Sequence, residues 1–255
     1  MPEVTAHSAL PTADVGRMFD RTARRYDLLN SLLSWGRDGA WRDRLAESVR
    51  EGERVLDLCC GSARSVVPAH HRSGREVIGL DLSRAMLAGG QRYARRKSSR
   101  FAPVQGDAFR LPFRDASFEV VTVAWGLRNL RPEPDALAEI LRVLRPGGKL
   151  LVLDSPSPEP GLVGRLHALY LRTAVPLLGR LSSDPEAYRY LAGTVLRYGT
   201  RQDVATRLQA AGLRVTHTRA LLLGAAAVWE AVKPLVAQPS DAVQVATPEP
   251  WSVAR

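Results

Sequence analysis

The chain has 255 residues, 45% of them hydrophobic, which is enough to bury one sizeable core. Its 36 Lys and Arg against 26 Asp and Glu give a formal net charge of +10. This charge favours nucleic acid or an anionic membrane surface as a partner. Arginines that are only solvated on exposed helix faces would explain the charge equally well. Neither a run of about 18 apolar residues nor a signal-like amino terminus occurs, so we expect no membrane span and no export, and a cytoplasmic location.

The cysteines, Cys59 and Cys60, are neighbours within an apolar run. This pattern is typical of two small buried side chains rather than of a disulfide. No spaced set of Cys and His with zinc-ligand spacing accompanies them, so the sequence predicts no metal site.

Strand-like segments that each lead into a helical pattern occupy residues 54–60, 76–82, 100–107 and 118–125. A further strand at 149–154 follows a helix at 135–144 and a Pro-Gly-Gly turn at 146–148, where proline stops the helix and glycine permits a positive φ. Continuous apolar strands that alternate with helices predict a parallel sheet covered on both faces.

The remaining helices are expected at 162–178, 185–198 and 201–211. Two strand candidates, 213–220 and 221–232, follow with almost no linker and must therefore be antiparallel. The prediction is an α/β fold with a mostly parallel seven-stranded sheet and an antiparallel C-terminal hairpin, which resembles class I methyltransferases rather than a dinucleotide-binding Rossmann domain. From about Gln238 the chain is rich in Pro, Ser and Ala, so we expect a flexible tail.

The first strand leads into VLDLCCGSARS (55–65), where Gly61 lets the chain turn toward a helix and Ser62 lets a ligand approach the backbone. A dinucleotide fingerprint would require three glycines to place backbone amides against a pyrophosphate, and only one is present. S-adenosylmethionine has no phosphate, so its site can dispense with that cradle.

Acidic residues mark three successive strands of the predicted sheet. Asp57 would face the loops around a methionine moiety, Asp81 could accept hydrogen bonds from both ribose hydroxyls, and Asp107 could accept one from an adenine amino group. A single acid at a strand end is as often a helix cap, but three at one sheet edge predict a site for S-adenosylmethionine. The other predicted cofactor contacts are Leu82, Ala108 and Ala124.

Several segments narrow the reaction further. They are VGRMFDRTARRYDLLNSLLSWGRDGAWRDRL (15–45), VLDLCCGSA (55–63), GLDLSRAML (79–87), WGLRNLRPEPDALAEILRVLRPGGKLLVLD (125–154), AVPLLGRL (174–181) and EAYRYLAGTV (186–195). Together they resemble the demethylmenaquinone and demethylubiquinone C-methyltransferases, whereas a general methyltransferase would share only the cofactor motifs. The resemblance implies methyl transfer to the ring of a demethylmenaquinol-like prenylated quinol in the biosynthesis of menaquinone or ubiquinone.

The resemblance also implies a division of the chain. The expected parts are a helical lid at 1–50, a methyltransferase domain at 51–234 with a helical insert at about 160–200, and a tail at 235–255. Tyr26, Asp27 and Asn30 in the lid are candidate substrate contacts, with ordinary helix packing as the alternative. The apolar residues of the insert, Leu162, Leu166, Leu169, Tyr170 and Val175–Leu178, could receive an isoprenoid tail, but packing is the expectation for most of them.

Methylation of an aromatic carbon requires an electron-rich ring, so a quinol must at least partly lose a phenolic proton. Arg128 and Asn129, just past the fourth strand, could hold the developing phenolate. Asp154 or His167 could receive the proton. The structural alternatives are that Arg128 pairs with a helix acid, Asp154 caps a helix and His167 packs.

The chain departs from the family pattern near the acceptor, since Trp229 stands in the place of a histidine and is therefore a predicted substrate contact. A different small phenolic or secondary metabolite is the alternative acceptor. Nucleic-acid methylation or binding is a third hypothesis, but the Asn-Pro-Pro-Tyr type of motif and any RNA-binding module are missing. With a membrane-dissolved quinol, the positive charge would hold the enzyme peripherally at the inner face of the membrane. The sequence does not decide whether the chain forms a homodimer.

Overall fold

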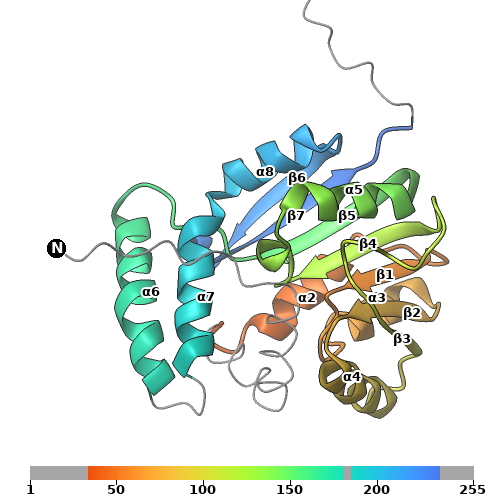
Figure 1. Cartoon of the computed structure of the whole chain (residues 1–255), viewed down its shortest axis with the longest axis horizontal. Helices are drawn as coiled ribbons and strands as arrows, with labels where there is room; N and C mark the ends of the chain where they lie inside the picture. The colour runs from red at the N-terminus through yellow and green to blue at the C-terminus, as the bar shows by residue number, and fades with distance from the viewer. Residues whose placement is uncertain (1–33, 181–184, 236–255) are drawn as a thin grey trace, which may run out of the picture.

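Figure 1 shows the computed structural model of the chain, which describes residues 34–180 and 185–235, with the side chains of 178–187 left out. The expected lid segment is therefore described only from Ser34 onward. Nearly all of the expected tail lies outside the described residues.

A seven-stranded sheet in the order β3-β2-β1-β4-β5-β7-β6 forms the centre of the fold. Its strands are β1 (Val55–Leu58), β2 (Val77–Asp81), β3 (Phe101–Gln105), β4 (Phe118–Ala124), β5 (Leu144–Asp154), β6 (Arg214–Leu221) and β7 (Ala226–Val232). Strands β1 to β5 are parallel, and β7 pairs antiparallel with both β5 and β6. The predicted α/β fold with an antiparallel C-terminal hairpin is confirmed.

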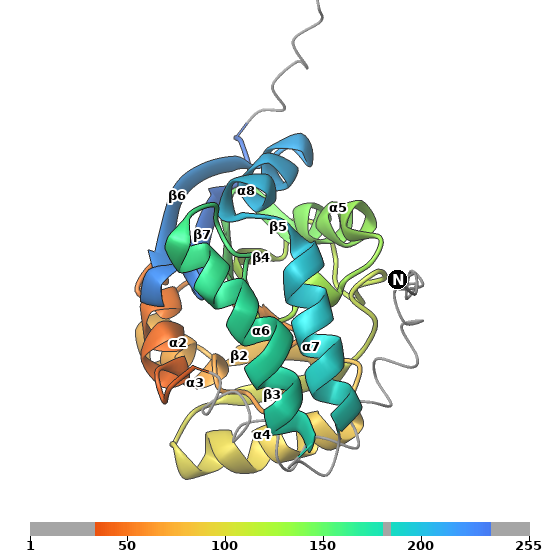
Figure 2. The same ribbon diagram turned by 90° about the vertical axis from the view of Figure 1, so that its left-hand side faces the viewer.

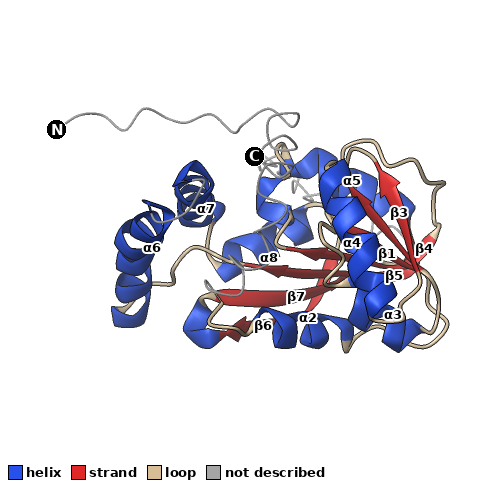
Figure 3. Ribbon diagram, turned by 90° about the horizontal axis from the view of Figure 1, so that it is seen from below, coloured by secondary structure: helices blue, strands red, loops and turns tan. Residues whose placement is uncertain are grey.

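Helices cover both faces of this sheet (Figure 3). They are α2 (Asp38–Ala46), α3 (Val66–Ser73), α4 (Arg84–Arg96), α5 (Glu133–Val143) and α8 (Arg201–Ala210). Successive strand residues point to opposite faces, so Val120 and Leu151 pack with α2, α3 and α4, whereas Val121 and Leu150 pack with α5 and α8. Both faces of the strands are buried, which explains their unbroken apolar sequence.

The connection from α5 to β5 differs from the prediction. The helix ends at Val143, and Leu144 is already extended (φ −71°, ψ 137°) and pairs with Phe118. Arg145 precedes Pro146, and proline disfavours the helical conformation in the residue before it. The Pro-Gly-Gly segment is therefore an irregular part of β5 rather than a turn ahead of it.

The C-terminal hairpin also begins later than predicted. Residues 222–224 form a short 3-10 turn in which Leu223 and Gly224 have φ values of 54° and 91°, so β7 starts only at Ala226. Ala227 pairs with Asp154, the last residue of β5. The hairpin turn therefore lies at the same sheet edge as the carboxyl ends of the parallel strands.

Helices α6 (Leu162–Arg180) and α7 (Pro185–Tyr198) form a pair beyond that edge, beside the sheet and its covering helices (Figures 1 and 2). Leu171 and Val175 of α6 and Tyr188 and Val195 of α7 form a small core of their own. The pair therefore packs largely on itself.

Packing was the expectation for most apolar residues of α6, and for several it is wrong. Leu162, Leu166 and Leu169 are 73%, 59% and 56% exposed, whereas Val175 is fully buried. The reason is that a helix paired with one neighbour buries only one side, and the structure places no described element against the other.

Candidate active site

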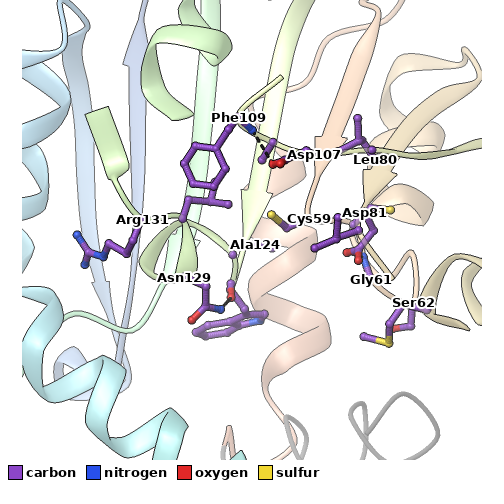
Figure 4. Close-up of a pocket in the computed structure, with 18 of the residues that line it drawn as sticks. Cys59, Gly61, Ser62, Leu80, Asp81, Asp107, Phe109, Ala124, Asn129 and Arg131 are labelled. Atoms are coloured by element: carbon purple, nitrogen blue, oxygen red, sulfur yellow. Dashed lines mark hydrogen bonds between the residues drawn. The ribbon is translucent and has the colours of Figure 1, made fainter. Parts of the chain in front are cut away.

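A cavity with about 910 Å³ of space, part of it open to solvent, lies at the carboxyl ends of β1, β2 and β4. The predicted residues that line it are Gly61, Ser62, Asp81, Leu82, Asp107, Ala108, Ala124 and Asn129. In Figure 4, Gly61 and Asp81 lie on one side of the cavity and Asn129 on the other. The fold thus gathers into one place residues predicted from four separate segments.

The loop after β1 turns tightly around Gly61. Cys59, Gly61 and Ala63 have positive φ values of 55°, 51° and 60°. A Cβ on Gly61 would lie 3.2 Å from the Cε atom of Met86, which also lines the cavity. Glycine keeps the turn relaxed and leaves the backbone accessible to a ligand.

Asp81 holds this loop in place from the end of β2. Its Oδ2 atom accepts a hydrogen bond from the Gly61 N–H at 2.8 Å, and its Oδ1 atom accepts one from the Ser83 N–H at 2.9 Å. Each carboxylate oxygen has a second lone pair. The fixed carboxylate can therefore also accept hydrogen bonds from the two neighbouring hydroxyls of a ribose.

Asp107 marks an apolar corner of the same cavity. Its Oδ1 atom accepts a hydrogen bond from the Phe109 N–H at 3.0 Å, and Phe109 and Leu80 line the cavity beside it (Figure 4). Two carboxylates in one wall would repel a phosphate but suit a cation. This donor set fits a cofactor that has an adenine, a ribose and a positively charged sulfur, as S-adenosylmethionine has.

Asp57 lies behind the cavity wall rather than in it. Its carboxyl group is buried, with Oδ1 accepting a hydrogen bond from the Thr122 hydroxyl at 2.6 Å and Oδ2 without a hydrogen-bond partner among the described residues. Burial raises the pKa of Asp57 to about 7, against the opposing effects of Thr122 and the Arg42 charge. A direct cofactor contact by Asp57 has no support in this position.

Replacing Asp57 by asparagine should remove a pH dependence of stability. The folded-state pKa of about 7 exceeds the unfolded value of 3.8, so the folded chain holds a proton that the unfolded chain loses, and stability falls as pH rises between these values. The wild type should lose on the order of 4 kcal/mol relative to Asp57→Asn across that window. Urea unfolding of both proteins from pH 3.5 to pH 8 measures the difference, and parallel curves would contradict the assignment.

Arg42 of α2 also reaches the cofactor cavity. Its Nε atom donates to Asp38 at 2.9 Å and its Nη1 atom donates to the Ser65 hydroxyl at 2.7 Å. Asp38 also accepts a hydrogen bond from the Trp125 indole N–H at 2.7 Å, which ties α2 to the end of β4. Sequence reasoning does not single out Arg42 or Trp125 as site residues, although both lie within the segments that carry the family resemblance.

A second cavity, with about 490 Å³ of space, lies between this sheet edge and the α6–α7 pair. It is lined by Ser34, Trp125, Arg128, Ser155, Tyr170, Leu171, Val175, Leu191 and Val195. Trp125 lines both cavities and has a positive φ of 63° at the point where the chain leaves β4. Trp125 is therefore a shared wall residue of the two cavities.

Arg128 belongs to the second cavity, where Asp154 anchors it. Its Nη1 atom donates to Asp154 Oδ1 at 2.6 Å and to the Trp125 carbonyl at 2.9 Å, and its backbone N–H donates to Asp154 Oδ2 at 3.1 Å. Asp154 also accepts from the Ser155 N–H at 2.8 Å and is fully buried. The acid that pairs with Arg128 thus comes from β5 and not from a helix.

Asn129 connects the cofactor cavity to α7. Its side-chain amide donates to the Trp125 carbonyl at 3.4 Å, and its Oδ1 atom accepts from the Tyr190 hydroxyl at 3.3 Å. Burial raises the pKa of Tyr190, so this phenol stays a neutral donor. Tyr190 is a further residue that sequence reasoning does not identify, because only the fold brings α7 to this edge.

Two further predicted residues, His167 and Trp229, line neither cavity, as is also true of Asp57 and Asp154. His167 on α6 is half-buried, and burial lowers its pKa, but its position gives no support to a role as proton acceptor. Trp229 is fully buried in the core, and its indole N–H donates to the Arg201 carbonyl at 3.0 Å. The predicted substrate contact by Trp229 is thus corrected to a core role, since a side chain under α8 cannot reach the sheet edge. Outside the described residues lie Tyr26, Asp27 and Asn30.

The model of the ubiE/COQ5 methyltransferase family matches residues 7–233. A demethylmenaquinone methyltransferase of Beutenbergia cavernae is 43% identical over 223 residues, which cover 86% of this chain and 91% of that protein. A demethylmenaquinone methyltransferase of Corynebacterium efficiens is 38% identical, with 87% of this chain and 94% of that protein covered.

Solved structures share the fold at low sequence identity. The cyclase SpnF superposes with a TM-score of 0.68 at 19% identity, covering 89% of this chain and 98% of its own. The geranyl diphosphate C-methyltransferase of Streptomyces coelicolor, solved with S-adenosyl-L-homocysteine, Mg²⁺ and geranyl diphosphate, has a TM-score of 0.55 at 15% identity, covering 76% and 78% of the two chains. These neighbours confirm the class I methyltransferase fold.

Proposed function

The chain belongs to the ubiE/COQ5 methyltransferase family, and from this we propose that it methylates a ring carbon of a demethylmenaquinol-like prenylated quinol. It is an S-adenosylmethionine-dependent methyltransferase. The curated relatives that are about 40% identical over most of the chain carry the name demethylmenaquinone methyltransferase, which supports this acceptor.

S-adenosylmethionine, when bound, supplies a methyl group on a positively charged sulfur. In the cofactor cavity Asp81 would bind the ribose and Asp107 the adenine amino group. Arg42, one of two arginines that line this cavity with Arg131, would pair with the carboxylate of the methionine part. Each assignment puts a protein charge or lone pair against a complementary group.

Arg128 would serve the acceptor. A ring carbon becomes nucleophilic as the neighbouring quinol oxygen loses its proton and gains negative charge. A guanidinium held by Asp154 and the Trp125 carbonyl is already fixed in the second cavity and can stabilise that charge without reorganising. Asp154 already accepts hydrogen bonds from Arg128 and Ser155, so we assign it the role of positioning Arg128. The phenolic proton of the quinol would then pass to solvent.

The shared wall at Trp125 is the observation that carries this proposal, because it sets a cation-bearing cavity directly beside the cofactor cavity. The test combines purified enzyme, S-adenosylmethionine with a labelled methyl group and total membrane lipid. The label should appear in a lipid whose mass matches a quinol with one added methyl group. Label that enters only soluble phenols or RNA would contradict the proposal.

Replacing Arg42 by alanine should raise the KM for S-adenosylmethionine by about 10- to 100-fold, the range for loss of a hydrogen bond to a charged group. Initial rates at varied cofactor concentration measure this. Arg44→Ala is the matched control, because Arg44 lies on the same helix with a partly exposed side chain. Decarboxylated S-adenosylmethionine should bind the wild type and Arg42→Ala equally well; a persistent difference would reject the carboxylate contact.

The acceptor proposed here is dissolved in a membrane. No helix within the described ranges is long and apolar enough to cross one.

A further inference from the structure

The outer side of α6 carries an apolar stripe that no described element covers. Leu162, Leu166, Leu169 and Leu177 are 73%, 59%, 56% and 58% exposed, and Val163 beside them is 48% exposed. Their spacing of three, four and eight residues places the leucines on one helix face. Below we call these five residues the α6 stripe.

The charged residues of α6 are all basic. Arg165 and Arg172 are exposed and lie seven residues apart, so both flank the same side of the α6 stripe. The helix sequence contains no Asp or Glu between Leu162 and Arg180. An apolar face bordered by arginines is the pattern of a helix that lies in the interface of an anionic bilayer.

Other exposed apolar side chains lie at the same end of the molecule. Leu223, in the turn between β6 and β7, is 82% exposed at the carboxyl edge of the sheet. Trp35 is 74% exposed and follows Ser34, which lines the second cavity. Figures 1 and 3 show α6 as the outermost helix at this end.

The second cavity lies directly behind α6. Tyr170, Leu171 and Val175 of this helix line it together with Leu191 and Val195 of α7. One helix therefore presents an apolar stripe outward and an apolar cavity wall inward. Arg128 lines the same cavity, so a molecule held there can contact both the apolar side chains and the guanidinium.

We propose that the α6 stripe rests on an anionic lipid bilayer and that a prenyl tail passes along the α6–α7 pair into the second cavity. The entry of the tail rests on the proposed function, whereas the docking surface does not. A second copy of the chain fits this surface less well, because an antiparallel two-fold contact across the stripe would bring Arg165 and Arg172 of both copies together, and a parallel one would offer them no carboxylate, since α6 has no Asp or Glu. Lipid phosphates would instead neutralise them.

The test measures binding of the full chain to vesicles of phosphatidylglycerol and phosphatidylcholine in equal parts. Leu166→Ser with Leu169→Ser should weaken binding about a hundredfold, since each leucine withdrawn from water contributes about tenfold or more. Arg165→Gln with Arg172→Gln should weaken it by about fivefold per arginine and only on the anionic vesicles. Leu235→Ser is the control, because Leu235 is 77% exposed beside Gly147, at the opposite edge of the sheet.

The same variants separate the surface from the reaction. With a water-soluble quinol that has a short tail, the leucine double variant should turn over like the wild type, whereas with a long-tailed quinol in vesicles its rate should fall with its binding. Vesicle binding that is unchanged in the leucine variant, or absent in the wild type, would overturn the proposal that the α6 stripe binds the bilayer. So would self-association that the same substitutions abolish. Normal vesicle binding without methylation of any quinol would reject the proposed function and leave the surface standing.

Discussion

Asp81→Asn is expected to weaken S-adenosylmethionine binding by about 100- to 1,000-fold, because the carboxylate that supports the Gly61 loop, and that we propose binds the ribose, loses its charge and one acceptor atom. Asparagine has nearly the same shape, so the Ser83 N–H can keep a partner. Titration calorimetry with S-adenosylmethionine measures the loss directly.

Substitutions of two other carboxylates serve as comparisons for Asp81→Asn. Asp115→Asn, in an 80% exposed side chain, should leave cofactor affinity unchanged. Asp107→Asn should have a smaller effect than Asp81→Asn, since Asp107 supports no part of the glycine loop. Affinity that survives in Asp81→Asn would show that this carboxylate does not bind the cofactor.

Arg128→Gln is expected to lower kcat by about 100- to 1,000-fold, as removal of a fixed donor at a developing negative charge does in other enzymes. Cofactor affinity should stay within about threefold, because Arg128 lines the second cavity and not the first. The alkaline rise of turnover should move to higher pH, since the phenolic proton is then lost without help from a cation. Steady-state rates from pH 6 to pH 10 measure both effects.

Asp154→Asn distinguishes this chemical role from a structural one. Both substitutions break the same buried ion pair and should destabilise the fold, by about 3 to 5 kcal/mol where one charge is left unpaired. Asp154→Asn keeps the guanidinium, so it should retain more turnover than Arg128→Gln at equal stability. Equal losses of turnover and stability in the two variants would show that Arg128 acts only through packing.

The fold was largely predictable, because each strand is a short apolar run bounded by a turn and each helix begins and ends at recognisable residues. Errors fell where two local signals overlap. The Pro-Gly-Gly segment resembles a turn, yet pairing of Leu144 with Phe118 draws it into β5. The run at 221–232 reads as one strand, yet Leu223 and Gly224 adopt positive φ and shorten it.

The cofactor residues were predictable for a different reason. Parallel strands bring their carboxyl ends to one edge, so Gly61, Asp81 and Asp107 had to meet once the strand order was known. Asp57 shows the limit of this reasoning: it lies within β1, and its side chain is buried behind the cavity. How deeply the side chain of a strand residue is buried depends on the elements that pack on the sheet. The sequence of the strand alone does not determine this.

The sequence by itself determined two things, the site for S-adenosylmethionine and the family. Both depend on short segments with fixed local geometry. Only the tertiary structure decided the partners that come from distant segments: Asp38 with Trp125, Arg42 with Ser65, Asp154 with Arg128, and Tyr190 with Asn129. It also decided that Trp229 is core and that Leu162, Leu166, Leu169 and Leu177 of α6 are exposed. Burial and pairing across the chain depend on how the layers pack, so no local pattern specifies them.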